Sequence, residues 1–135
     1  MSDFPLRIVT PEGVMFQGPA QKLVVRTAGG DMAILARHTD YVAPLGMGKT
    51  LVETEKGRRY GACIGGLVRV LDGGVTLVAT TFEWAEQIDG QRAAKAEQQA
   101  REELENPNLS CSEERLAKAR LKRAQLRQYV AAYKE

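Results

Sequence analysis

Hydrophobic and polar positions alternate along the first two thirds of the chain, in short runs separated by glycine-rich turns. Alternation with a period of two residues, interrupted this often by turn residues, predicts β-strands joined by hairpins. We therefore expect an antiparallel β-sandwich of about ten strands in this part of the chain. The runs occupy residues 6–9, 14–16, 22–26, 32–35, 42–47, 50–53, 59–64, 67–71 and 75–79.

The pattern changes across residues 83–93, where the spacing of apolar positions goes from two residues to between three and four. No glycine follows Gly90, and Ala, Glu, Lys, Arg and Leu recur at helical spacing. The expected fold class is α+β, with a β-sandwich domain at 1–87 and an α-helical domain at 88–135.

Two helices are expected in the second domain, because capping residues mark both of their starts. Asp89 is a suitable N-cap for a helix that runs to about Glu105, and Ser110 with Glu113 forms a capping box for a second helix. Residues 106–108 separate the two, which predicts an antiparallel hairpin. Most of its facing apolar positions are alanines, so the hairpin buries little area. We expect it to be marginally stable alone and able to detach from the sandwich.

Charge and cysteine usage narrow the classes of function. Residues 1–87 carry nine Lys and Arg against nine Asp and Glu, and residues 88–135 carry ten against eight. So small a positive excess argues against nucleic-acid binding. Signal-peptide features and membrane-length apolar runs are missing, which favours a cytoplasmic protein. Cys63 and Cys111 have no metal-ligand spacing, so we expect reduced thiols, with Cys63 as a small core residue.

The sequence predicts no catalytic residues and no metal site. His38 has no second histidine or thiol at ligand spacing, and no nucleophile and base form a recognisable pair. Residues 43–50 match a relaxed Walker A pattern, but they run into a strand and a hairpin turn. A phosphate-binding loop must instead enter a helix whose N-terminus cradles the phosphate. We therefore expect no nucleotide binding by 43–50.

Arginines of the hairpin suggest one binding site. If the hairpin is symmetric about Asn108, residues 88–92 lie beside 123–128, and three arginines converge at its open end. Guanidinium groups gathered in this way are stabilised by an anion with several negative charges. Ordinary surface ion pairs with neighbouring carboxylates, worth about 0–1 kcal/mol each, are the alternative. The arginines are Arg92, Arg123 and Arg127, and the carboxylates are Glu83, Glu86 and Asp89.

Four segments occur in the order and spacing of a known family. They are 6–13, 30–35 with His38, 65–70 and 88–93. Over essentially its whole length the chain resembles the epsilon subunit of the F-type ATP synthase. It departs from the family at residues 36–38, Ala-Arg-His, where Pro-Gly-His is common.

This resemblance implies a non-catalytic rotor subunit of a proton- or sodium-translocating ATP synthase, at the cytoplasmic face of the bacterial plasma membrane. A ten-stranded sandwich would bind the gamma subunit and the c-ring of the central stalk, so the chain would be peripheral to the membrane. The hairpin would permit turnover when folded down, and would inhibit ATP hydrolysis when extended along gamma. No cofactor is required.

The resemblance also implies that ATP is a regulatory ligand, because Ile88 to Ala93 fits the motif I/L-D-x-x-R-A of ATP-binding bacterial members. Gln99 stands where strong binders carry an arginine. A basic face on the second helix would contact an acidic loop of the catalytic beta subunit in the extended state, although a solvated face is an equal alternative. The implied ATP-binding residues are Glu83, Ile88, Asp89, Arg92, Ala93, Arg123 and Arg127; the basic face is Arg115, Lys118, Arg120 and Lys122.

A different class of function is a stand-alone ATP- or anion-binding regulatory module, in which the arginine cluster would be the whole function. The two hypotheses differ in whether the chain binds a gamma and c-ring assembly.

Overall fold

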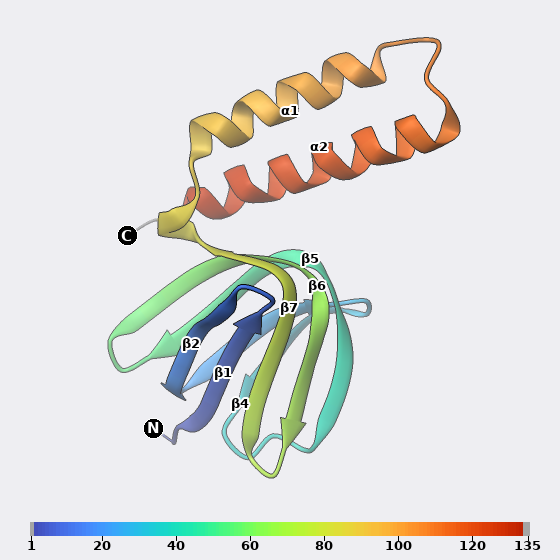
Figure 1. The fold of residues 1–135 in the computed structure, drawn as a ribbon. Helices are drawn as coiled ribbons and strands as arrows, with labels where there is room; N and C mark the ends of the chain where they lie inside the picture. The colour runs from blue at the N-terminus through green and yellow to red at the C-terminus, as the bar shows by residue number, and fades with distance from the viewer. Residues whose placement is uncertain (1, 134–135) are drawn as a thin grey trace. The chain divides into compact units, whose positions relative to one another are not determined.

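The computed structural model describes residues 2–133 and divides the chain into two compact units, Met1–Trp84 and Ala85–Glu135 (Figure 1). The first unit contains the strands and the second the helices. The strands are β1 (Phe4–Thr10), β2 (Gly13–Ala20), β3 (Lys22–Thr27), β4 (Gly30–Leu35), β5 (Tyr41–Thr54), β6 (Gly57–Leu71) and β7 (Gly74–Trp84). The helices are the 3₁₀ helix η1 (Ala85–Gln87), α1 (Gly90–Leu104) and α2 (Cys111–Ala131).

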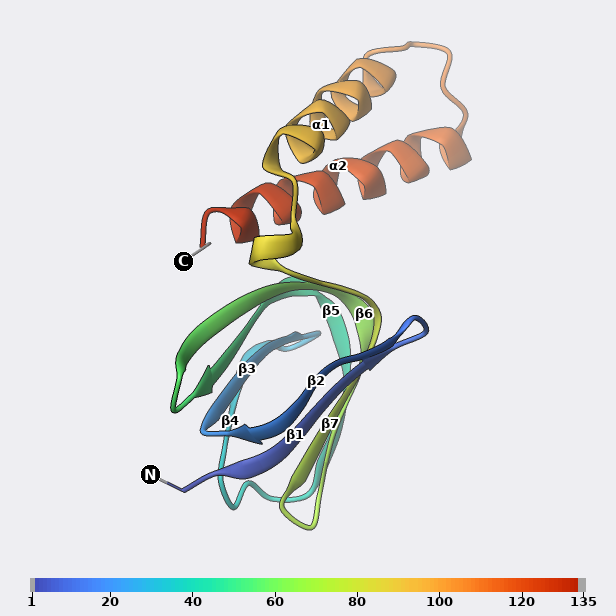
Figure 2. The ribbon, with the colours of Figure 1, turned by 60° about the vertical axis from the view of Figure 1, so that its left-hand side comes forward.

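The strands form one sheet in the order β2-β1-β7-β6-β5-β3-β4, which folds over on itself into a sandwich (Figure 2). A β-sandwich followed by a two-helix hairpin confirms the predicted α+β class. Neighbouring strands are antiparallel except for β1 and β7, which pair in parallel from Leu6 with Val75 to Val9 with Val78. The expectation of a wholly antiparallel sheet was wrong there, because β1 and β7 are not joined by a turn that would fix their relative direction.

The described residues contain seven strands instead of about ten, because glycines that resemble turns lie inside long strands. β5 spans 14 residues and β6 spans 15. Their ladder continues from Leu45 with Gly66 to Met47 with Ile64. The expected runs 42–47 and 50–53 are therefore one strand, as are 59–64 and 67–71. The Walker-like residues 43–50 lie wholly within β5, as their rejection as a phosphate-binding loop requires.

The bend of β6 depends on Gly66. Its φ of +123° is a conformation that side chains rarely adopt, and a Cβ added there would overlap the carbonyl oxygen of Val78 on β7. By contrast, the turn between β6 and β7 falls between the predicted runs 67–71 and 75–79. Asp72 and Gly73 both have positive φ, at 49° and 82°, as a two-residue type I′ hairpin turn requires.

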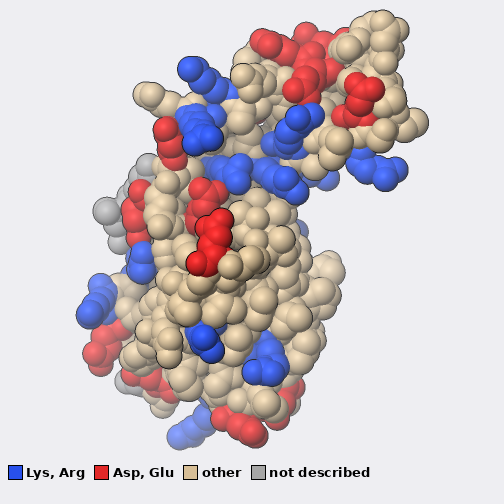
Figure 3. Space-filling view, in the orientation of Figure 1, with Lys and Arg blue, Asp and Glu red and all other residues tan. Residues whose placement is uncertain are grey.

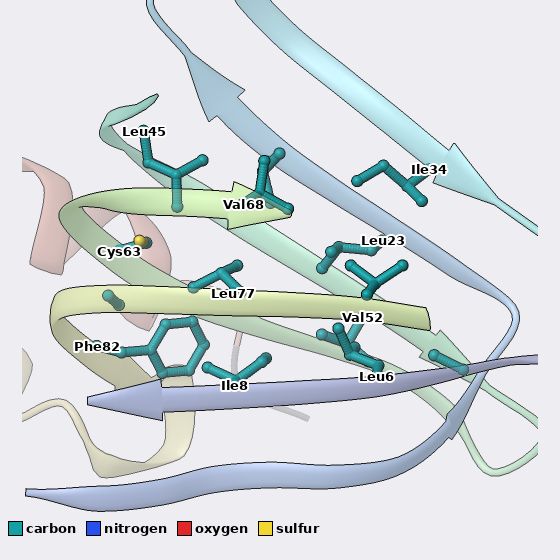
Figure 4. Close-up of a cluster of buried hydrophobic side chains, with 14 of the residues drawn as sticks. Leu6, Ile8, Leu23, Ile34, Leu45, Val52, Cys63, Val68, Leu77 and Phe82 are labelled. Atoms are coloured by element: carbon teal, nitrogen blue, oxygen red, sulfur yellow. The ribbon is translucent and has the colours of Figure 1, made fainter. Parts of the chain in front are cut away.

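The core of the sandwich consists of the inward positions of the strands (Figure 4). Leu6 and Ile8 on β1 and Leu77 on β7 are almost completely buried, and outward residues alternate with them. Cys63 belongs to this core and is a free thiol, as predicted. Burial raises the pKa of this thiol to about 12, so it stays protonated and unreactive.

The helical unit is an antiparallel pair held together by small side chains. The fully buried residues of α1 are Ala93 and Ala100, and those of α2 include Ala117 and Ala124. Each pair is seven residues apart, so each helix presents one alanine stripe, as the sequence predicts. Among the described residues, neither helix has the length and apolar character of a membrane span.

Polar contacts across the hairpin set its register. α2 has 21 residues and α1 has 15, so α2 extends past the end of α1. The residues of α2 that have no partner on α1 lie at the loop end, where Leu116 is 62% exposed. At the open end, a Cβ on Gly90 would lie 4.0 Å from that of Ala131. The polar contacts are a 2.7 Å ion pair of Arg120 with Glu103, and a hydrogen bond that Gln128 donates to Glu97.

Glu97 also accepts a 2.8 Å hydrogen bond from Nε of Arg101, one turn further along α1. Hydrogen bonds from Arg101 and Gln128 lower the pKa of this carboxyl group below its ordinary value. A lowered folded-state pKa means that the ionised group stabilises the folded hairpin. This contribution is fully present above the unfolded-state pKa of about 4.3, and it is lost as the pH falls through the folded-state pKa.

Replacing Glu97 by Gln should therefore lower the unfolding midpoint of the helices at pH 7 and leave it nearly unchanged at pH 3. Thermal unfolding followed by helical circular dichroism measures both midpoints. Glu105→Gln is the matched control, since Glu105 lies beyond the end of α1 and loses the same charge. Equal effects of the two substitutions at pH 7 would contradict the stabilising role of the ionised Glu97.

Candidate functional site

Residues 88–93, which match the ATP-binding motif, form the entry into α1. Ile88 is buried, and its amide donates a 3.2 Å hydrogen bond to the carbonyl oxygen of Ala85. Asp89 has an extended backbone and is the N-cap, as predicted. Its Oδ1 accepts hydrogen bonds of 3.1 Å from the amides of both Gln91 and Arg92. The carboxylate of Asp89 thus occupies the place at the helix start where an anion would otherwise bind.

Two of the three candidate arginines project into solvent. Arg92 and Arg123 are exposed, and neither side chain forms an ion pair or hydrogen bond with a described residue of the helical unit. Arg127 is half-buried. Neutralisation by described carboxylates of the unit therefore does not account for Arg92 and Arg123, and both guanidinium groups are accessible to an anion.

The register of the hairpin separates these arginines more than symmetry about Asn108 predicts. Since Gly90 lies opposite Ala131, Arg92 is level with the last turn of α2. Arg123 lies six residues before that level, or about 9 Å along the helix axis at 1.5 Å per residue. The predicted register was wrong because the loop at 105–110 lets α2 begin beyond the end of α1. An extended anion spans this offset and can contact both arginines.

Glu83 and Gln99 belong to different elements of the fold. Glu83 belongs to β7 in the other unit, where its backbone pairs with Ala62 of β6. Gln99 is exposed on α1. The inclusion of Glu83 in one site with the arginines stays a prediction, as does the effect of Gln99 on affinity.

The basic residues of α2 form two stripes instead of one face. Positions three and seven residues apart share a side of a helix. One stripe is Arg115, Lys118 and Lys122, and the other is Arg120, Arg123 and Arg127. Lys118 pairs with Glu114 at 3.0 Å, and Arg120 pairs with Glu103 at 2.7 Å. Of the predicted basic face, Arg120 thus lies on a different stripe and is held by α1. Figure 3 shows basic side chains along α2 and acidic ones on α1.

The outer face of the sheet is a second candidate site, which the sequence did not reveal. Five of the seven large hydrophobic side chains that the described sandwich exposes project from this face. The strand register places three of these side chains in one row across adjacent strands. Leu67 pairs with Pro44 on one side and with Val78 on the other, and Val9 pairs with Val78 on one side and with Val14 on the other. A contiguous exposed apolar surface is typical of a protein interface. The five are Val14, Val42, Leu67, Leu71 and Val78.

This face was missed because both sides of its strands are apolar. In 67–71, Leu, Val, Val and Leu surround Arg69, so the alternation does not tell which side is buried. The signal available was the number of apolar residues, which exceeds what one buried face needs.

No group of three or more potential metal ligands occurs among residues 2–133.

Comparison with known proteins identifies the family. Residues 3–85 match the family model described as ATP synthase, Delta/Epsilon chain, beta-sandwich domain. The chain is 37% identical over 131 residues to the ATP synthase epsilon chain of Bacillus pumilus, covering 97% of this chain and 98% of the relative. It is 35% identical over 132 residues to that of Ruminococcus albus, with the same coverages.

Solved structures share the fold. A chain in the mitochondrial ATP synthase of Euglena gracilis matches 98% of this chain and 79% of its own length, with a TM-score of 0.72 and 24% identity. One from the central stalk and c-ring of the Tetrahymena thermophila mitochondrial enzyme matches with a TM-score of 0.61 and 14% identity, over 94% and 95% of the two chains. The sequence relatives extend over both the sandwich and the hairpin, and the chain therefore belongs to the ATP synthase epsilon chain family, as a non-catalytic subunit.

Proposed function

We propose that this chain is a rotor subunit of a proton- or sodium-translocating F-type ATP synthase, which docks into the central stalk through the outer face of its sheet. The observation that carries the proposal is the apolar row of Pro44, Leu67, Val78, Val9 and Val14. In water such a row is unfavourable, at about 25 cal/mol per Å² of exposed apolar surface. Burial against a partner removes this cost.

The partners we propose are the gamma subunit and the c-ring. Family membership supports this assignment, as does the likeness in fold to a chain from a central stalk and c-ring assembly. In this role the chain is peripheral to the cytoplasmic face of the bacterial plasma membrane, and its partners are proteins, not nucleic acids. It needs no cofactor, because it transmits torque by binding.

The substitution Val78→Asp tests this docking. Val78 is 41% exposed at the centre of the row, so a carboxylate there changes the surface without entering the core. Binding of the full chain to its cognate ATP synthase depleted of this subunit should weaken by about tenfold or more, because a charge would be desolvated at the interface. Surface plasmon resonance measures the affinity.

Leu35→Asp is the matched control, since Leu35 is 53% exposed on the edge strand β4. Equal binding by the two variants would exclude the outer face as the docking surface. A wild-type chain that never binds the depleted enzyme would instead favour the stand-alone anion-binding module.

The hairpin is the proposed regulatory element, which permits ATP hydrolysis when closed and inhibits it when extended along gamma. Its construction supports this role. Its helices contact each other through alanines, and the Arg120–Glu103 pair between them is an exposed ion pair of small stabilising value. In the extended state, the stripe of Arg115, Lys118 and Lys122 would face an acidic surface of the catalytic beta subunit.

A disulfide between positions 90 and 131 would lock the hairpin closed. The two Cβ atoms would lie 4.0 Å apart, within the usual range for a disulfide. We expect ATP synthase reassembled with Gly90→Cys/Ala131→Cys, in a Cys111→Ser background, to hydrolyse ATP faster when oxidised than when reduced. The Cys111→Ser chain under both conditions is the control. Equal rates in both redox states would show that opening of the hairpin does not inhibit.

ATP is the proposed regulatory ligand of the hairpin. Arg92 and Arg123 offer accessible guanidinium groups, and the triphosphate is an extended anion. Asp89 caps the N-terminus of α1, and Ile88 and Ala93 are buried at the same end of the helix.

Titration calorimetry with the full chain tests ATP binding. We expect measurable heat at millimolar ATP, and its loss in Arg92→Ala, because a charge-assisted contact to the phosphates is removed. Lys95→Ala, one turn further along α1, is the matched control. Wild-type heat that survives Arg92→Ala, or no heat at all, would remove ATP sensing and leave the docking proposal unaffected.

A further inference from the structure

A pair of arginines lies next to the apolar row, on the outer face of the sheet. Arg7 on β1 and Arg69 on β6 each pair in register with Thr76 on β7, the strand between them. Adjacent strands are about 4.8 Å apart, so the two Cα atoms are about 10 Å apart. Both side chains are exposed, and neither forms an ion pair or side-chain hydrogen bond with a described residue.

The arginines border an open hollow of about 690 Å³. Gly74 is one of the residues that line it, near Leu71 on β6 and Pro5 on β1, and it carries no side chain that would fill the space. Leu71 is 49% exposed at the border. The lining of the hollow thus combines apolar side chains, such as Pro5 and Leu71, with two guanidinium groups.

The charges of this face are unbalanced. The outward residues in register with the arginines are Val42, Thr76 and Gln17, none of which is acidic. Figure 3 shows separate basic and acidic patches on the sandwich, with uncharged surface between them. The lining of the hollow also includes the carboxylate of Asp3, so two guanidinium groups stand against one carboxylate, and the remaining positive charge favours an acidic partner. Each guanidinium can bind a carboxylate through two parallel hydrogen bonds.

We propose that the hollow receives an acidic segment of a partner protein, which inserts a large apolar side chain above Gly74 and presents carboxylates to Arg7 and Arg69. The inference rests on docking through the outer face and adds the chemistry of the partner. A protein segment fits better than a free anion because the apolar row continues from the hollow, and a partner that covers both buries one continuous surface.

Neutralising both arginines tests the charge contribution. Binding of the full chain to its cognate ATP synthase depleted of this subunit should weaken about tenfold in Arg7→Gln/Arg69→Gln, and the affinity of this variant should depend less on salt. Lys22→Gln/Lys56→Gln removes the same charge from other parts of the sandwich and should bind within about twofold of wild type. Unchanged unfolding midpoints establish that all variants are folded.

Filling the hollow is an independent test. A Cβ at position 74 would meet its nearest neighbours at 3.6 and 3.8 Å, which are ordinary contacts, so Gly74→Leu is compatible with the fold. It should also weaken binding about tenfold, because it occupies the space of the partner's side chain.

A zero-length carbodiimide crosslink reports the partner's chemistry. The reagent joins a carboxylate to an amine but not to a guanidinium, so Arg69→Lys should give a new crosslink to an acidic peptide of the partner, identified by mass spectrometry. The native amines of Lys22 and Lys56 are internal controls. Binding of Arg7→Gln/Arg69→Gln as tight as wild type, or no new crosslink, would overturn this inference. Failure of the wild-type chain to bind at all would instead overturn the proposed docking.

Discussion

The sandwich depends on the close approach of two backbones, at Gly66 on β6 and Val78 on β7. Any side chain at position 66 would overlap the carbonyl oxygen of Val78, and the positive φ of Gly66 lets β6 bend without leaving the ladder. Because the ladder is unbroken, β5, β6 and β7 stay in register across the bend. Leu67 and Val78, which pair with each other, are thereby held on the outer face. The surface that we assign to docking is thus rigid before the partner arrives, which reduces the entropy lost on binding.

The helical unit follows a different principle. Its helices meet through alanines, which bury little apolar area, so exposed polar pairs such as Arg120 with Glu103 contribute a larger share of its stability. Pairs of this kind stabilise by about 0–1 kcal/mol and respond to salt and pH. A hairpin built in this way opens at a lower free-energy cost than a leucine-rich one. This property suits a regulatory element, whereas a docking surface needs the stiffness of the sheet.

Much of the fold could be predicted from residues that act locally. Asp89 and Ser110 cap the two helices as their side chains suggest, and Asp72-Gly73 forms the hairpin turn. Features set by distant contacts could not be predicted. Gly65 and Gly66 resemble a turn, yet a neighbouring strand keeps them inside β6. The parallel pairing of β1 with β7 and the register of the hairpin likewise depend on contacts between elements, not on local pattern.

The candidate sites show the same limit. The N-cap role of Asp89 could be predicted from the sequence. The distance between Arg92 and Arg123 could not, because it depends on the length of the loop and on how far α2 extends past the end of α1. The outer face was hidden because its strands are apolar on both sides. Hydroxyl-radical footprinting of the full chain, alone and reassembled into ATP synthase, measures its burial directly. We expect Leu67, Leu71 and Val78 to lose labelling in the complex while Leu35 keeps it; equal labelling of all four in both states would contradict docking through this face.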